Sequence, residues 1–266
     1  MTLLLAALLT LQQSDEELRA LVEQFDKTTD AREREGHPSS PWYKVHRAGP
    51  AILKPLAAAF PGRSQGRNVE CGTCGWSPEG EYPLVRLMLS FGDRSLPVLL
   101  SLLKDPDPAK ARIAAAVMCR FSGQEIVGPL LDLAKRIDLS KDPDVDRHVA
   151  EALANATFLK FKSRAELSEW FDLAKHRSQV AWLREAINHP DRERANRDSS
   201  IKGIQRLLEA PDRLKTLIHC YADLEWREAR VPLHYLTGHG NLEKWDPRDL
   251  VKERADWKVC RDRSIH

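Results

Sequence analysis

Two cysteines separated by two residues, Cys71 and Cys74, are the pair in this sequence best suited to chemistry. Thiols at that spacing form a redox pair, one half of a zinc site, or a small structural disulfide. A zinc site needs a second ligand pair, haem attachment needs a His after Cys74, and a thioredoxin-type centre needs a strand-turn-helix context. None of these accompanies the motif. We predict a structural or incidental role, such as a local disulfide, with metal binding or redox chemistry as the alternative.

Other residue types offer no recognisable catalytic centre. His234 and His239 flank a predicted helix end, where a capping or surface role is the simpler interpretation. The sequence contains no H-E-x-x-H, G-x-S-x-G or P-loop motif, and no G-x-G-x-x-G motif after a strand. Cys119 lies on the apolar side of a predicted helix, which favours a small core residue over a nucleophile. We therefore predict no catalytic residues, no metal site, no cofactor and no enzymatic activity.

The sequence feature that would favour nucleic-acid binding is a basic cluster made of Arg192, Arg194, Arg197, Lys202 and Arg206. Trp182 is a candidate for stacking on a base beside this cluster. Asp191, Glu193 and Asp198 interleave the arginines, a pattern more typical of a solvated mixed-charge loop. The chain carries 41 basic and 39 acidic residues, so its formal charge of +2 provides no overall attraction to nucleic acid.

A short sequence motif that recurs along the chain, called here the first repeated phrase, indicates the elements that position these residues. The segments 49–56, 92–99 and 123–130 align without gaps, each with a Gly, an apolar residue four positions later and a Leu seven positions later. The Gly suits the left-handed end of one helix, and the two apolar positions lie on one face of the next. We expect Leu56, Leu99 and Leu130 to be buried between helices.

A second phrase precedes the Gly. Segments 112–123 and 227–238 align with each other, and 147–158 fits the same template without its Gly. In the first copy, Ala114, Val117, Met118 and Phe121 form a helical stripe. Prolines after or beside acidic residues, at Asp105 to Pro108, Asp142-Pro143 and 210–212, separate the helices. Capping boxes begin helices at Ser14 and Ser163.

Together the two phrases resemble the HEAT and HEAT-like family, including the phycobilin-lyase-like repeats and exported bacterial HEAT-repeat proteins. Arg112 to Leu133 is most similar to the family unit, and Pro232 departs from it by standing inside a first helix, where we expect a kink. The resemblance implies an all-α, right-handed α–α superhelix, a HEAT/armadillo-like solenoid of about five to six helix pairs. We expect one repeat domain over residues 14–266, with a loop insertion near 189–199 and a C-terminal cap over 238–266.

The tryptophans suggest where such a scaffold would bind. Trp170 falls on a predicted core stripe with Leu167, Phe171 and Ala174, and Trp42, Trp76, Trp226, Trp245 and Trp257 lie near loops or helix ends, where a ring can anchor a partner. For Trp245 and Trp257, capping the stack is an equally good interpretation. We predict a non-catalytic scaffold for a protein or peptide partner. The alternative is a HEAT-like enzyme or nucleic-acid-binding protein, either similar to alkylated-base glycosylases or to bilin lyases.

The N-terminal apolar run, within residues 1–13, bears on localisation. It is too short to cross a bilayer of about 30 Å at about 1.5 Å per residue, so no transmembrane anchor is expected. Its length fits a secretory signal peptide, although no Lys or Arg precedes it. We expect an exported protein, periplasmic or extracellular, with a buried apolar segment in a cytoplasmic protein as the alternative. Five cysteines are too few for a disulfide-built scaffold.

Overall fold

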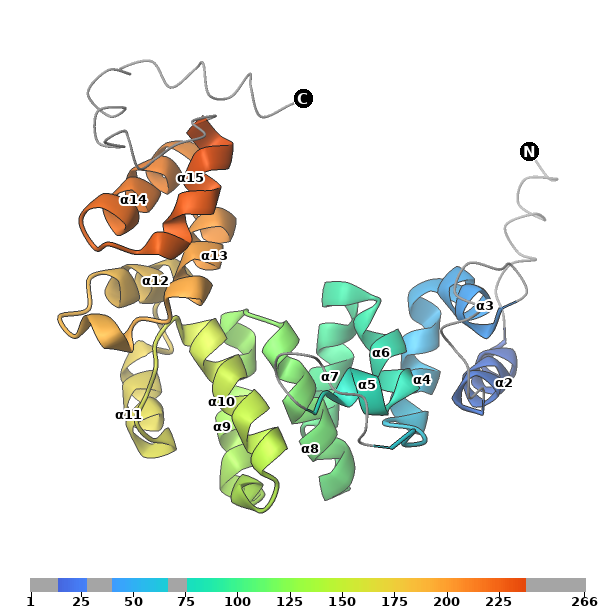
Figure 1. Ribbon diagram of the computed structural model, residues 1–266. Helices are drawn as coiled ribbons and strands as arrows, with labels where there is room; N and C mark the ends of the chain where they lie inside the picture. The colour runs from blue at the N-terminus through green and yellow to red at the C-terminus, as the bar shows by residue number, and fades with distance from the viewer. Residues whose placement is uncertain (1–13, 28–39, 67–75, 238–266) are drawn as a thin grey trace. The chain divides into compact units, whose positions relative to one another are not determined.

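The computed structural model describes residues 14–27, 40–66 and 76–237 of the chain. Every regular element in these residues is a helix (Figure 1), and the only strand-like pairing among them is an isolated antiparallel bridge between Leu159 and Ala195. The predicted all-α fold is confirmed. The N-terminal run 1–13, Cys71, Cys74, His239 and the expected cap 238–266 lie outside the described residues.

The contacts within the chain divide it into two compact units. Unit 1 comprises Met1–Phe121 with Pro129–Ala152, and unit 2 comprises Ser122–Gly128 with Leu153–His266. Two helices contain a boundary between the units, namely α9 (Val127–Arg136) and α10 (Pro143–Thr157).

Unit 1 is a series of short helices that pack against their neighbours. Its complete helices are α2 (Asp15–Asp26), α3 (Pro41–Ala48), α4 (Leu53–Ala59), α5 (Pro78–Glu81), α6 (Pro83–Leu89), α7 (Leu96–Leu102) and α8 (Pro108–Val117). Helix α2 contacts α3 and α4, α4 contacts α7, and α7 contacts α8. The buried apolar faces of these helices are thereby covered by neighbouring helices of the same unit.

Unit 2 continues in the same manner. Its complete helices are α11 (Arg164–Ala174), α12 (Gln179–Ile187), α13 (Arg197–Leu207), α14 (Ala210–Ala222) and α15 (Arg230–Thr237). Contacts run in sequence order from α12 to α13, α13 to α14 and α14 to α15.

The first repeated phrase corresponds to one structural unit in all three copies. Each copy opens with a 3₁₀ turn, η2 (Gly49–Ile52), η3 (Gly92–Ser95) or η5 (Gln124–Ile126), and then becomes an α-helix at the fourth residue after the Gly. The Leu seven positions after the Gly is fully buried each time, at Leu56, Leu99 and Leu130. The predicted register of these helices is therefore confirmed.

The glycines of that phrase are not equivalent. Gly49 and Gly92 have φ of 68° and 57°, the left-handed region that favours glycine, as expected. Gly123 has φ of −79° and ψ of 152°, so the expectation of a left-handed glycine is wrong there. The preceding turn η4 (Met118–Arg120) ends at Phe121 in an extended conformation, and the chain needs no left-handed residue to leave it.

The second phrase also forms the predicted helices. Ala114, Val117, Met118 and Phe121 are all buried. In the copy at 147–158, α10 ends at Thr157, and Phe158 stands where the template has its Gly. Phe158 adopts φ of 64°, a left-handed conformation that Gly123 at the equivalent position of the first copy does not adopt.

Helix starts follow the polar and proline signals in the sequence. Ser14 and Glu17 form the predicted reciprocal capping box of α2. Asp107 caps α8 by accepting a hydrogen bond from the Ala109 amide at 2.8 Å, and Pro108 follows as the first helical residue. At α11 the box is incomplete, because Glu166 accepts from the Lys162 amide at 2.7 Å and not from that of Ser163.

Two local expectations are corrected. The insertion expected over 189–199 ends earlier, because α13 begins at Arg197. Pro232 does not kink a helix, because the 3₁₀ turn η8 (Arg227–Ala229) precedes it and α15 begins at Arg230. Pro232 thus lies in the first turn of α15, where a missing N–H leaves no intrahelical hydrogen bond unmade.

Within the described residues, no helix has both the length and the apolar character needed to cross a membrane.

Candidate partner-binding surface

Helix α3 is fixed at both of its ends, which gives its side chains defined positions. The Ser40 hydroxyl accepts a hydrogen bond from the Tyr43 amide at 3.1 Å, and Pro41 begins the helix. Gly49 ends the helix with its positive φ. Val45 is fully buried and anchors the helix, while Tyr43, Lys44 and Arg47 are exposed.

Four rings from three segments form a ladder on unit 1. Trp42 lies against Phe25 of α2, with ring centroids 5.9 Å apart, and against His46 at 4.8 Å. His46 in turn stacks on Phe91, which follows α6, at 5.2 Å. Phe25 is buried, while Trp42, His46 and Phe91 are half-buried. Trp42 and His46 are four residues apart, the helical spacing that places them on one face.

Polar contacts fix the orientation of this ladder. The Arg86 guanidinium of α6 lies over the Trp42 ring, 5.8 Å from its centroid, in a cation–π arrangement. The Nε2 of His46 lies 2.9 Å from the Ser90 hydroxyl oxygen, and that hydroxyl donates to the Leu87 carbonyl. Because the hydroxyl's only hydrogen is used there, His46 Nε2 is the donor in the first contact.

The outer side of α3 carries one exposed ring and two exposed cations. Tyr43 is 41% exposed, and Lys44 and Arg47 are exposed beside it. We call these three residues together with Trp42, His46, Arg86 and Phe91 the α3 surface. Trp, Tyr and Arg are the residue types that contribute most binding energy at protein interfaces, because a ring provides large contact area at low entropy cost.

Of the tryptophans predicted to anchor a partner, only Trp42 stands at this surface. Trp76 and Trp226 are buried, at 8% and 1% exposed, and Trp245 and Trp257 lie outside the described residues. Trp170 is half-buried, although its stripe neighbours Leu167 and Ala174 are buried as predicted. Sequence reasoning missed His46, Phe91 and Arg86; the spacing of Trp42 and His46 was the one local signal for the ladder.

Trp76 has a different role, which its contacts define. Its indole N–H donates to the buried carboxylate of Glu81, which also accepts a hydrogen bond from the Ser64 hydroxyl at 2.6 Å. The Gln65 amide donates to the Glu81 carbonyl at 2.9 Å. Glu81 therefore holds residues on both sides of the segment 67–75. The ring of Trp76 also packs edge-on against His148 at 5.5 Å.

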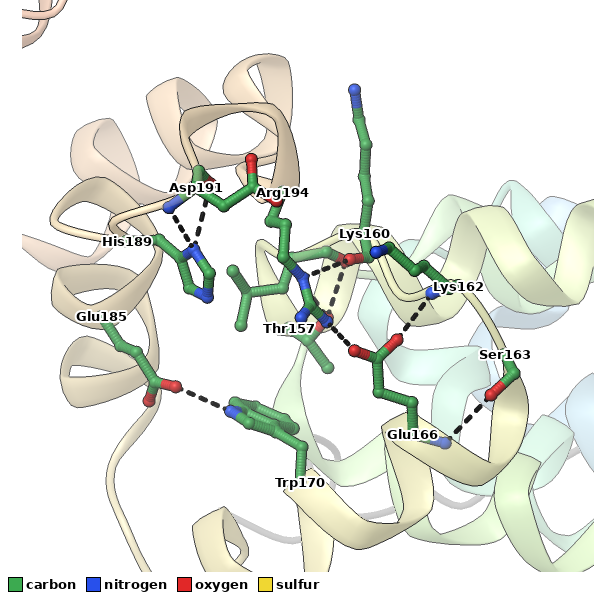
Figure 2. Close-up of polar contacts among 11 residues, drawn as sticks. Thr157, Lys160, Lys162, Ser163, Glu166, Trp170, Glu185, His189, Asp191 and Arg194 are labelled. Carbon is green, nitrogen blue, oxygen red and sulfur yellow. Dashed lines mark hydrogen bonds and ion pairs between the residues drawn. The ribbon is translucent and has the colours of Figure 1, made fainter.

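Two of the five basic residues in the cluster, Arg194 and Arg206, are engaged within unit 2. Figure 2 shows Arg194 facing Glu166, with which it forms an ion pair at 2.7 Å. The guanidinium also donates to the Lys160 carbonyl at 3.3 Å and lies over the Phe161 ring. Arg206 donates to the Ser122 carbonyl at 2.9 Å. These arginines brace the unit and do not form an open edge.

Trp182 is not available to stack on a base. It is 1% exposed, and its indole N–H donates to the Ala174 carbonyl at 2.9 Å. Trp170 packs on it with ring centroids 5.2 Å apart. The indole N–H of Trp170 donates to Glu185 at 2.8 Å (Figure 2). Arg177 binds the other oxygen of that carboxylate. Trp182 is therefore not the stacking residue considered under the nucleic-acid alternative, because tertiary packing places it in the core.

The remaining candidates do not converge on a site. His234 is exposed on α15 beside Tyr235, and its predicted neighbour His239 lies outside the described residues. Cys119 is a half-buried thiol and Cys220 a buried one. Burial raises the pKa of the Cys220 thiol to about 12, which disfavours the nucleophilic thiolate. In the part of the chain that the structure describes, no three His, Cys, Asp or Glu side chains are grouped to hold a metal ion.

Comparison of the chain with models of known families, with curated proteins and with solved structures finds no significant match.

Proposed function

We propose that this protein is a non-catalytic, HEAT-like repeat scaffold that binds a protein or peptide partner through the α3 surface. In this proposal the helix pairs form a right-handed α–α superhelix of the HEAT/armadillo type. Support for the repeat architecture comes from the three equivalent turn-and-helix segments. It also comes from the contacts between successive helices within unit 1 and within unit 2.

The observation that carries the binding proposal is the composition and support of the α3 surface. A Trp, a Tyr and an Arg gather there on two helices, and the Trp42 ring is held by Phe25, His46 and Arg86. A ring already fixed in this way loses little further freedom on binding, so more of its contact energy appears as affinity.

The proposal is tested by quantitative capture of partners from an extract of the source cells, comparing the intact chain with Tyr43→Ala. Truncating an interface Tyr at a hot spot weakens binding by about tenfold or more. Leu173→Ala is the matched control, because Leu173 is an apolar side chain that is 83% exposed on α11 and does not belong to the α3 surface. A partner retained equally by all three proteins contradicts binding through this surface.

A further inference from the structure

The distribution of acidic residues around α3 is uneven. Residues 36–69 contain no Asp or Glu, although the chain has 39 acidic residues among 266. The basic residues of this stretch are Lys44, Arg47, Lys54, Arg63 and Arg67. A chain of almost neutral formal charge therefore contains a stretch of sequence whose only formal charges are positive, and α3 lies within that stretch.

The two cations on α3 are not engaged by the rest of the described protein. No hydrogen bond or ion pair joins the side chain of Lys44 or Arg47 to another residue in the ranges 14–27, 40–66 and 76–237. This differs from Arg194 and Arg206 of unit 2, which are held by Glu166 and Ser122. Lys54 faces Asp15 at 3.7 Å, but both side chains are largely exposed, and such pairs interact weakly.

The rings of the α3 surface favour a protein over a nucleic acid as the occupant. Base stacking needs an open ring face, and the Trp42 ring has Phe25, His46 and Arg86 around it. His46 is in turn covered by Phe91. Among the described rings of the α3 surface, only that of Tyr43 is classed as exposed, and one exposed ring with cations beside it suits a single apolar anchor flanked by charged residues.

We propose that the α3 surface binds an acidic peptide segment that carries an aromatic or aliphatic anchor. The anchor packs against Tyr43 and the exposed edge of Trp42, and the carboxylates pair with Lys44 and Arg47. This proposal rests on the proposed scaffold function and names its partner class. Complementary charge speeds association and sets specificity, and both effects weaken as salt screens the charges.

The test is selection from an unbiased library of short displayed peptides against the intact chain. We expect the enriched peptides to be rich in Asp and Glu around one aromatic or aliphatic residue. Selected peptides are then synthesised and titrated against Lys44→Glu/Arg47→Glu, for which we expect a loss of about tenfold or more in affinity. The control Arg192→Glu/Lys202→Glu changes the net charge equally at exposed positions of unit 2 and should leave affinity within about twofold.

The possible outcomes separate this inference from the proposed function. Enriched peptides that need Tyr43 but are neutral or basic, or that tolerate the charge reversal on α3, overturn the acidic partner and leave the scaffold function standing. Absence of any Tyr43-dependent peptide contradicts both. A labelled oligonucleotide that binds more tightly than the best peptide, with affinity that falls steeply with salt, replaces the acidic peptide by nucleic acid.

Discussion

The ring of Phe158 lies directly against Gly203 of α13. A Cβ atom added to Gly203 would come 2.6 Å from Cε1 of that ring and 3.3 Å from a methyl group of Leu183. Phe158 is 1% exposed and holds a left-handed backbone conformation, so it has no free space to move into. Residue 203 must lack a side chain because α13 passes this closely over the end of α10.

Gly203→Ala should therefore destabilise unit 2. Alanine is the better helix former, which alone would favour the variant by up to about 1 kcal/mol. Overpacking of a buried contact costs about 1–3 kcal/mol, and more when no side chain can yield. We expect a lower midpoint in urea unfolding followed by circular dichroism.

Gly128→Ala is the matched control, because its added Cβ would meet the Phe171 ring at 3.6 Å, an ordinary contact. Gly128 lies in α9, so the gain in helix propensity remains without the clash. Equal destabilisation by the two substitutions would show that the close approach of α13 is not the cause.

The buried Leu of the repeated phrase provides a second prediction. Leu99→Ala should lower the free energy of unfolding by about 2–5 kcal/mol, because Leu99 is fully buried between neighbouring helices of unit 1. Leu173→Ala, at an exposed position, should change it by less than about 0.5 kcal/mol. Urea titration of both variants checks this, and a silent Leu99→Ala would count against the register of α7.

The helices and their registers were predictable because they depend on local chemistry. Prolines, caps and apolar spacing act within one or two turns, and they placed the starts of α2, α8 and α11 and the buried Leu positions correctly. The left-handed conformation of Phe158 was not predictable. A non-glycine residue adopts it only where the surrounding packing compensates for the strain, and that packing comes from α13.

The candidate surface was predictable only at Trp42. The ladder joins residues 25, 42, 46 and 91 from three separate segments, so no local pattern contains all of it. The same limit explains why the burial of Trp182 was not predicted, because its place in the helical spacing fits an exposed position and a buried one equally well. Burial was decided by the packing of α11 on α12 through Trp170 and Phe171.

Glu166 links stability to pH. A hydrogen bond from the Lys162 amide, and then the positive charge of Arg194, hold the pKa of this carboxyl below its ordinary value. Since folding lowers the pKa, the contribution of the carboxylate is fully present above the ordinary Glu pKa. It is lost as pH falls through the lower pKa of the folded state.

Glu166→Gln should therefore reduce the urea midpoint near about pH 7, and the difference from the unsubstituted protein should shrink towards about pH 3. Glu169→Gln on the same helix is the control, because Glu169 is exposed and makes no hydrogen bond to another described residue. We expect that variant to differ little at any pH. If the urea midpoint of Glu166→Gln were lower by the same amount at every pH, the negative charge of Glu166 would not be the cause of its stabilising effect.

The two thiols in the described residues should react in a fixed order with iodoacetamide. The thiolate is the reactive form, and burial both removes Cys220 from solvent and raises its pKa to about 12. Cys119 is half-buried and should be modified first in the native protein. Modification of Cys220 should wait for opening of the helices around α14, so its rate should rise steeply with urea. Mass spectrometry of proteolytic peptides measures each site separately. Native-state modification of Cys220 at the rate of Cys119, with no response to urea, would mean that α14 does not bury this residue against α13 and α15.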